Sequence, residues 1–507
     1  MKIISSKRTG IPRLAWCLIK EINEPIIKLL HGSDVEAEDE FFIEGVWDGE
    51  YVKKEIHTAH ALMGSGGCIH DNKLIVCCPS HTSEGLYSLK ADNGSLYISN
   101  SIPFILTQSN HFLDPDYPDY ESDMLSISDG LDSYKKSIPL IGNQLSIHYF
   151  CNLLINQQGD IEVRKKIRTK DFMNYEDYYT TLLDTLKKIS DNASDGERTS
   201  IKYKPIVFCS TGYDSTACAA LGRKIGCSEA VVYESKRSYK KDSGKAIVER
   251  LGYEKVVEKH ELDYLHYSTA HEFVSSGELG TSIFFASSEA ELAGKFLLSG
   301  SHGDVIWNKK LPASDDIKRS FYPDTAKKEF RLRVGFINVL VPFFNVQSFA
   351  SINCISNSEE MQPWSLSNSY DRPIPRRIAE NAGVPREWFG TKKHGGAGSN
   401  LRFANLWHLK KVMSYESFSS FYAFYLKTKR LRLKCFKRHI PYLLYCANIV
   451  LEAKGIGVLE RMLKISNWDR KLKCSPWAPS YLFLWGTDEL RKMYKANQLR
   501  DNSALLV

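Results

Sequence analysis

The chain has 507 residues and a formal net charge of +7, with 43% hydrophobic, 25% charged and 12% aromatic residues. This length exceeds what one ordinary hydrophobic core serves, so we expect two or three domains, and the composition excludes disordered, collagen-like and fibrous chains. The 12 cysteines are scattered without C-x-x-C pairs, which favours a reducing compartment over a disulfide framework or a zinc site. No secretory signal is visible, and the longest apolar stretch, residues 440–451, is about half of the roughly 20 residues that span a bilayer. We therefore expect a cytoplasmic protein without a transmembrane segment.

The first part of the chain, which we assign to a domain of residues 1–170, reads as β-rich. Short alternating runs are broken by Gly, Asn and Asp, as in FFIEGVW, KLIVCCP, GLYSLKADNGSLYISN and QLSIHYFCNLLINQQGDIEVRKK. This alternation predicts strands, with hairpin turns at residues 92–94 and 157–160. We interpret the glycine cluster at residues 64–67 as a further turn.

Residues 171–400 carry a different pattern, in which strands and helices alternate. A helix is predicted over residues 175–191, and the polar stretch at 192–200 reads as a linker. Strands KPIVFCS, AVVYES, KVVEKH and KFLLSG then alternate with helices predicted at 214–221 and 242–251. Apolar strands alternating with amphipathic helices predict an α/β fold with a parallel, doubly wound sheet.

Residues 401–507 form a basic and almost wholly helical C-terminal region, which we assign to the second domain. Lysines and arginines gather between residues 427 and 438. Such a cluster is typical of a surface that faces RNA, an acidic peptide or anionic lipid, or simply of a solvated helical face.

The strongest local signal is PIVFCSTGYDSTACAALG at residues 205–222. A buried strand ends at Ser210, a polar turn contains Gly212, and a helix opens near Asp214. Backbone N–H groups at such a helix start point outward, and small residues let a polyphosphate approach them closely. The pattern is neither a Walker loop nor the Rossmann glycine motif. It therefore predicts a phosphate site of another type.

The residues STGYDS at 210–215 resemble the S-G-G-x-D-S loop of the N-type ATP pyrophosphatases, the PP-loop superfamily. Three further segments look like blocks of the asparagine synthetase family, and they follow in that family's order. They are YKKDSGKAIVERLGYEKVVEKH (239–260), LLSGSHGDVIW (297–307) and YDRPIPRRIAENAGVPREWFGTKKHGGAG (370–398). The resemblance implies an asparagine-synthetase-like, PP-loop ATP-binding domain at residues 171–400.

A weaker resemblance reaches the N-terminal part. Residues 75–106 are similar to a stretch of that family's Ntn-type glutaminase domain, which needs Cys at position 2 with a free α-amino group. This chain starts Met1-Lys2, and we expect neither Cys17 nor Cys68 to replace that nucleophile. The resemblance thus implies a degenerate glutaminase-like domain, a layout closest to the glutamine-independent β-lactam synthetases and lasso-peptide cyclases.

The resemblance implies an amidotransferase-like carbon–nitrogen ligase that uses ATP and Mg²⁺. Such enzymes activate a small-molecule or peptide carboxylate as an acyl-adenylate, release pyrophosphate, and let an amine or ammonia attack. By position, Asp214 and Asp304 would be the metal carboxylates, with Asp304 and Lys392 catalytic. The nucleotide-binding residues implied are Ser210, Thr211, Gly212, Tyr213, Asp214, Ser215, Gly300, Gly303 and, through the backbone, Val232 and Tyr233.

Alternatives stay open for several of these residues. Asp214 would also serve as a helix N-cap and Asp304 as a plain loop acid, while Lys393 competes with Lys392 for the position of the family lysine. Thr211, Ser301 and Val305 depart from the family pattern. His302, beside Ser301, would deprotonate the attacking amine or merely form a hydrogen bond in its loop.

Two other classes of function compete with the ligase. A PP-loop enzyme that modifies tRNA or another nucleotide would suit the basic C-terminal region, although the missing C-x-x-C pair argues against a thiolating enzyme. A catalytically silent nucleotide-binding protein would explain the three departures.

Overall fold

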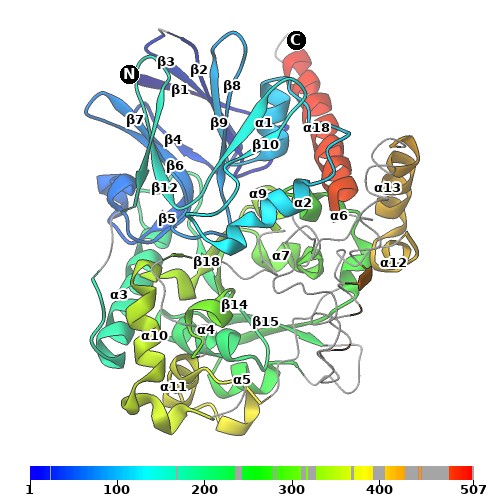
Figure 1. Cartoon of the computed structure of the whole chain (residues 1–507). Coiled ribbons are helices and arrows are strands. Elements are labelled where there is room, and N and C mark those ends of the chain that lie inside the picture. The colour runs from blue at the N-terminus through cyan, green and yellow to red at the C-terminus, as the bar shows by residue number, and fades with distance from the viewer. Residues whose placement is uncertain are drawn as a thin grey trace.

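The computed structural model has a mixed α/β fold with a β-rich N-terminal region and a parallel sheet (Figure 1). It describes residues 1–504 except 23, 167–169, 235–241, 278–279, 281, 310–315, 318–326, 367–369, 392–405, 429–442, 445–446, 448–450 and 452–478. Within these ranges, no helix has the length and apolar character needed to cross a membrane.

Two sheets built mainly from antiparallel pairs make up the N-terminal region, which we call the sandwich (residues 2–165). The order of the first sheet is β1 (Lys2–Lys7), β3 (Ile26–His31), β2 (Trp16–Lys20), β9 (Leu96–Ser99), β8 (Leu86–Lys90), β11 (Gln144–His148) and β10 (Ser137–Pro139). The order of the second is β13 (Ile161–Lys165), β12 (Cys151–Ile155), β7 (Lys73–Cys77), β6 (Leu62–His70), β5 (Phe41–Trp47) and β4 (Glu36–Ala37). The predicted strands and both predicted hairpins are present, which confirms the β-rich reading.

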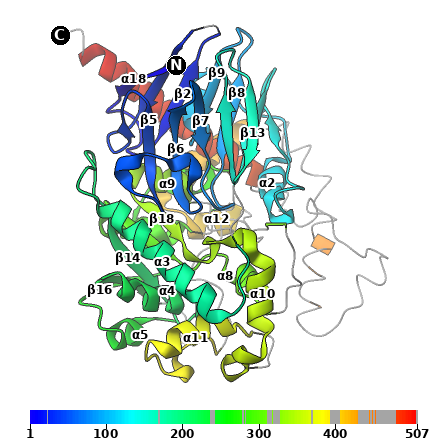
Figure 2. The ribbon, with the colours of Figure 1, turned by 90° about the vertical axis from the view of Figure 1, so that its left-hand side faces the viewer.

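The two sheets pack face to face, because alternate residues of each strand point into the space between them. Leu18 and Leu29 of the first sheet belong to one buried cluster with Val76 and Leu153 of the second. The rings of Trp16 and Phe42 meet edge to face across this layer, with centroids 5.0 Å apart. Figure 2 shows the strands of the sandwich from the side.

A five-stranded parallel sheet follows, with the order β16 (Lys255–His260), β15 (Glu229–Glu234), β14 (Lys204–Cys209), β17 (Lys295–Ser299) and β18 (Ile337–Leu340). The chain runs from β14 outward to β16 and then returns to the other side of β14 as β17. Val207 and Leu298 face one buried cluster, whereas Ile206 and Leu297 face another. Both faces are covered, as parallel sheets require.

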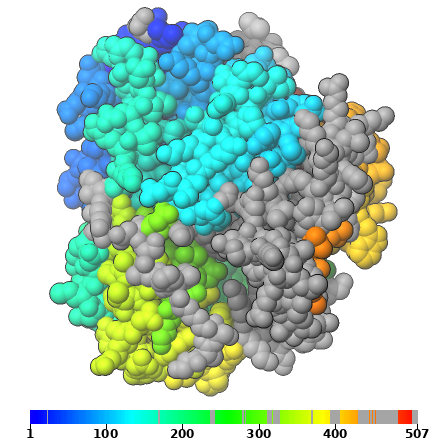
Figure 3. All heavy atoms as spheres, in the orientation of Figure 1, coloured from blue at the N-terminus to red at the C-terminus, as the bar shows by residue number. Residues whose placement is uncertain are grey.

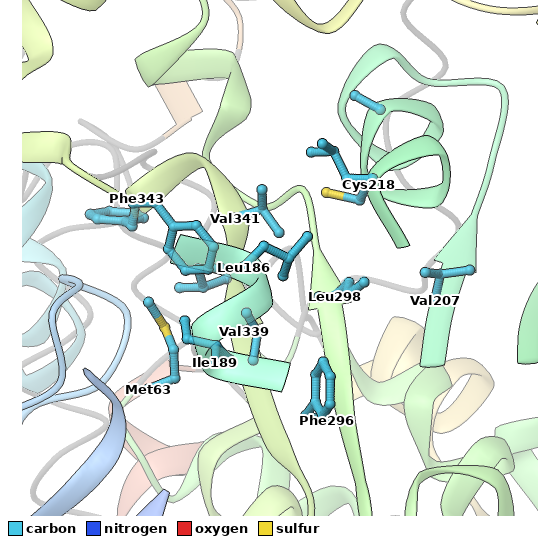
Figure 4. Packing of buried hydrophobic residues seen from close by; sticks show 14 of the residues in the cluster. Met63, Leu186, Ile189, Val207, Cys218, Phe296, Leu298, Val339, Val341 and Phe343 are labelled. Atoms are coloured by element: carbon cyan, nitrogen blue, oxygen red, sulfur yellow. The ribbon is translucent and has the colours of Figure 1, made fainter. Parts of the chain in front are cut away.

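Helix α3 (Tyr175–Ser194) joins the two parts, since it contacts both β5 and β14. Figure 4 shows its Leu186 and Ile189 beside Phe296, Leu298 and Val339 of the parallel sheet, with Met63 reaching this cluster from the sandwich. The other helices are α1 (Ile102–Gln108), α2 (Tyr120–Met124), α4 (Tyr213–Lys224), α5 (Lys245–Arg250), α6 (Ala270–Val274), α7 (Glu289–Leu292), α8 (Gly303–Ile306), α9 (Lys328–Val334), α10 (Phe349–Asn357), α11 (Pro373–Asn381), α12 (Leu406–Val412), α13 (Tyr415–Lys427) and α18 (Pro479–Ala504).

Three local predictions were wrong. The glycine cluster lies inside strand β6, where a Cβ on Gly66 would approach Phe42 O to 2.3 Å, so the glycines permit close strand packing. The stretch 192–200 is no free linker, because buried Arg198 donates to Gly45 O (3.0 Å) and the Thr199 hydroxyl donates to Glu36 (2.6 Å). Helix α5 begins at Lys245, three residues later than expected.

A buried guanidinium connects the sandwich to the parallel-sheet region. Arg331 on α9 is 1% exposed and donates to both oxygens of Glu84 at 3.0 and 2.7 Å. It also donates to Glu44 of β5 at 2.9 and 3.3 Å. Burial opposes the charge of Arg331, yet the two carboxylates raise its pKa above the usual range.

In the space-filling view the blue and cyan atoms of the sandwich rest on the green and yellow atoms below (Figure 3).

The C-terminal helix α18 packs against α6 and also against α1 and α2 of the N-terminal region. Beneath it lies Glu272 of α6, which is 2% exposed. Burial raises the pKa of Glu272 to about 7, and this outweighs the opposing effect of its ion pair with Arg333. Arg333 keeps a second partner, Glu289, at 2.7 Å to both oxygens.

Replacing Glu272 with Gln should change the pH dependence of stability. Because the folded-state pKa lies above the unfolded value, ionisation of this carboxyl destabilises the fold as pH rises from about 4.5 to 7, by up to about 3 kcal/mol. Relative to wild type, Glu272→Gln should therefore gain thermal stability between pH 5 and pH 8, as followed by melting temperature.

The variant must be compared with wild type at each pH. Burial lowers the pKa of His81 to about 3 and that of His271 to about 4, so these two histidines make the fold more stable as pH rises over the lower part of this range. Glu289→Gln removes the more exposed carboxylate from the same guanidinium and is the matched control. A difference between Glu272→Gln and wild type that stays constant from pH 5 to 8 would contradict the assignment.

Candidate functional site

The carboxyl ends of β14 and β17 meet where the strand order of the parallel sheet reverses. Ser210 directly follows β14 and Gly300 directly follows β17, and the two strands are hydrogen-bonded neighbours. In open α/β sheets, ligands bind in the crevice outside the carboxyl ends of the strands at such a reversal. The two segments with the strongest motif signals therefore lie at the place where this topology puts a ligand.

The loop from Ser210 to Ser215 is ordered by its own side chains. The Gly212 N–H donates to Ser210 Oγ (3.2 Å), and the Ser210 and Ser215 hydroxyls lie 2.9 Å apart. Gly212 occupies the N-cap of α4, where it offers no side-chain oxygen to the first helical turn. No capping side chain thus competes with a ligand oxygen at this helix start.

Asp214 lies within the first turn of α4, so Gly212 rather than Asp214 is the N-cap. The loop after β17 presses closely on this aspartate. A Cβ on Gly300 would come within 2.6 Å of the Asp214 backbone, and one on Gly303 within 2.5 Å of the Asp214 carboxylate carbon. Only glycine fits at these two positions, and the contact brings the segments of Asp214 and Asp304 together.

Arg372 forms an ion pair with Asp214, one of the two candidate metal carboxylates. Its guanidinium is 5% exposed and donates to Asp214 Oδ2. Burial opposes the charge of Arg372, but Asp214, and to a lesser degree Asp304, raise the pKa of this guanidinium above its usual value. One cation therefore acts on both acids.

The segment after Tyr370 forms the outer wall of the loop. Arg376 of α11 donates to the hydroxyl of Tyr213 (2.7 Å) and lies over its ring, 4.9 Å from the centroid. The Gly390 N–H donates to Thr211 O (2.8 Å). The sequence pattern assigned a role only to the lysine that follows this segment; Arg372 and Arg376 were not predicted, although the basic run DRPIPRR at residues 371–377 contains them.

The departures from the family pattern have identifiable contacts. The Thr211 hydroxyl donates to Asp242 Oδ1 (2.7 Å), which ties the loop to the residues before α5. Ser301 Oγ lies 2.8 Å from Ser299 Oγ. Val305 packs against the hydrophobic core.

Val232 and Tyr233, near the end of β15, are buried. Val232 is fully enclosed, and the Tyr233 hydroxyl lies 2.6 Å from Ser288 Oγ and donates to Phe284 O (3.3 Å). Burial raises the pKa of Tyr233 above its usual range. Because both side chains are engaged in the core, Val232 and Tyr233 would meet a ligand only through their backbone groups.

His302 contacts the sandwich. Its Nε2 lies 2.7 Å from the hydroxyl of Ser83 in the sandwich, and the side chain is 4% exposed. Its ring meets Phe343 edge to face at 5.4 Å. The geometry matches the hydrogen-bonding alternative for this histidine.

Lys392 and Lys393 lie outside the described residues, as does the basic cluster beyond Lys427. Cys17 and Cys68 are buried, and burial raises the pKa of the Cys68 thiol to about 12 and that of Cys17 further. The structure thus brings together the Ser210 loop, Asp214, Gly300, Gly303 and Asp304.

Comparison with models of known protein families gave no match, and a search of curated proteins found none with significant similarity. Among the described residues, no group of three or more His, Cys, Asp or Glu side chains is arranged to hold a metal ion. Asp214 and Asp304 alone would need further ligands, such as phosphate oxygens and water, to hold a metal ion.

Replacing Arg372 with Met should destabilise the fold, because it removes the buried cation that faces Asp214. Breaking a buried ion pair from one side costs on the order of 3–5 kcal/mol, so a clear fall in melting temperature is expected. The double variant Arg372→Met with Asp214→Asn should recover much of the loss, since the neutral amide needs no counter-charge. A double variant no more stable than Arg372→Met would contradict the pairing.

Proposed function

We propose that this protein is an ATP-dependent amide-bond-forming ligase of the asparagine synthetase type. It would bind ATP with Mg²⁺ at the reversal point of the parallel sheet, activate the carboxylate of a small molecule or peptide, and join it to an amine or ammonia. The observation that carries the proposal is the meeting of the Ser210 loop and the Gly300 loop at the ends of β14 and β17.

The contacts of the Ser210 loop support pyrophosphate binding. Ser210 and Ser215 hold the turn, and Gly212 leaves the start of α4 open to phosphate oxygens. Arg372 adds a buried cation beside this turn. A helix start and a guanidinium both stabilise negative charge. Both would therefore stabilise pyrophosphate, which gains negative charge as it leaves.

The residues present fit Mg²⁺. This ion binds through one or two protein carboxylates while phosphate oxygens and water complete its shell. Asp214 and Asp304 supply two carboxylates, and the part of the chain that the structure describes holds no cluster of three such ligands. Bound there with ATP, it would neutralise charge on the phosphates as the substrate carboxylate approaches.

The proposed chemistry has two steps. An oxygen of the substrate carboxylate forms a bond to the α-phosphorus of ATP, and pyrophosphate leaves with the bonding electrons. The amine nitrogen then bonds to the acyl carbon, AMP leaves, and the amine gives up a proton. Lys392, by its resemblance to the family lysine, would stabilise the negative charge of the leaving pyrophosphate or of the second-step oxyanion.

The sandwich would be a degenerate glutaminase-like domain in this proposal. Cys17 and Cys68 are poor substitutes for an N-terminal nucleophile, since burial disfavours their thiolates. Ammonia would thus not come from glutamine in this chain, and the amine would be supplied by a substrate or by free ammonia.

Isotope exchange between ATP and pyrophosphate tests the first step. We expect exchange with Mg²⁺ and one pool among amino acids, peptides and small carboxylates. Asp214→Ala and Asp304→Ala should each reduce it by at least about 100-fold, because each removes a carboxylate that holds the reacting phosphates. Asp184→Ala, on the exposed face of α3, is the matched control and should retain wild-type exchange.

Exchange that survives in both site variants would overturn the assignment of the site. ATP binding without exchange in any pool would instead favour a silent nucleotide-binding protein. Binding of tRNA that weakens steeply with salt would favour an enzyme that modifies RNA.

A further inference from the structure

A buried segment of the sandwich contacts the residue that precedes α8, the short helix that carries Asp304. Residues 80–84, Ser-His-Thr-Ser-Glu, are each between 0% and 4% exposed. Within this segment Ser83 Oγ lies 2.7 Å from Nε2 of His302, two residues before Asp304. This hydrogen bond connects the N-terminal region to the candidate nucleotide site.

His302 adopts a backbone conformation that needs support. Its φ is +68° and its ψ 4°, in the left-handed region that few residues other than glycine adopt, with asparagine, aspartate and histidine the most frequent among them. It is the N-cap of α8, so this conformation directs the chain into the short helix Gly303–Ile306. The position of Asp304, in the first turn of α8, depends on it.

The imidazole of His302 is held on two sides. Ser83 engages Nε2, and the ring of Phe343 packs against it with the centroids 5.4 Å apart. Phe343 also meets His81 at 6.1 Å. Surrounding structure that fixes a side chain in this way is what allows a strained conformation to persist.

Ser83 is itself fixed from the sandwich side. Its N–H donates to Nδ1 of His81 (3.2 Å), and the next residue, Glu84, accepts two hydrogen bonds from Arg331. The hydroxyl of Ser83 is therefore presented to His302 from a rigid support, as positioning of a site residue requires.

We infer that Ser83 is a positioning residue, which holds His302 in its left-handed conformation and thereby sets Asp304 for the metal-bound nucleotide. The inference rests on the proposed function and deepens it. Under this inference the sandwich needs no nucleophile to have a role, because the hydroxyl of Ser83 would help to position the nucleotide site.

Magnesium dependence of ATP binding provides the test, because it needs no knowledge of the substrate. ATP affinity would be measured by calorimetry in EDTA and across a Mg²⁺ titration. Ser83→Ala should raise the Mg²⁺ concentration for half-maximal enhancement about five- to tenfold, as expected for loss of one buried hydrogen bond. ATP affinity in EDTA should stay within about twofold of wild type, since the Ser210 loop is untouched.

The chain offers a matched control and an independent second variant. Ser88→Ala removes a serine whose Oγ lies 2.8 Å from Nε2 of His148, a contact wholly within the sandwich, and should leave Mg²⁺ dependence unchanged. His302→Asn accepts the left-handed conformation but loses the imidazole. It should reproduce the effect of Ser83→Ala, and the double variant should be no worse than either single one.

The outcomes separate this inference from the proposed function. Equal Mg²⁺ dependence in wild type and Ser83→Ala, or additive effects in the double variant, would overturn the positioning role alone. A parallel loss of affinity with and without Mg²⁺ would also overturn it, because that is the mark of general destabilisation. Failure of wild type to bind ATP under either condition would overturn the proposed function as well.

Discussion

The buried guanidinium of Arg331 is the interaction on which the relation between the two halves of the molecule depends. It comes from α9, beside the parallel sheet, and both carboxylates that balance it belong to the sandwich. Separating the halves would take the guanidinium of Arg331 away from both carboxylates, so the two buried ion pairs would be lost together. Removing one partner from such a buried pair costs several kcal/mol. Because the guanidinium of Arg331 is planar and bonds to four carboxylate oxygens, it fixes the orientation of the two halves as well as their distance.

This orientation has a consequence for the candidate site, because Glu84 is adjacent to Ser83. The segment that pairs with Arg331 is the same segment that meets His302, so the interdomain ion pair and the Asp304 loop are linked through one peptide unit. With the proposed positioning role of Ser83, the sandwich would contribute to nucleotide binding through its structure alone.

Much of the fold could be predicted from the sequence because the signals are local. Alternation of apolar residues predicted strands such as Gln144–His148, and the pattern of strand, turn and helix around Gly212 predicted the loop. The missed features are contacts between distant residues. Arg198 lies in a stretch that reads as a linker, yet its partners are in β5 and α3. Likewise nothing in local pattern reveals that Arg372 pairs with Asp214, 158 residues away. Periodicity reports burial, whereas the partner of a buried charge is decided by the tertiary fold.

The charges at the site argue for a divalent cation in any reaction there with ATP. Asp214, Asp304 and Arg372 together carry a formal charge of −1 when all three are ionised, and an ATP triphosphate adds further negative charge. A substrate carboxylate that must approach the α-phosphorus would meet this repulsion in a partly buried region, where charges interact more strongly than in water. Arg372 forms an ion pair with Asp214, so its positive charge balances that aspartate and leaves little to balance the charge of the phosphates. With Asp214 and Asp304 as its ligands, a divalent cation would offset the negative charge of the carboxylates and of the phosphates, which would explain two acids at an anion site.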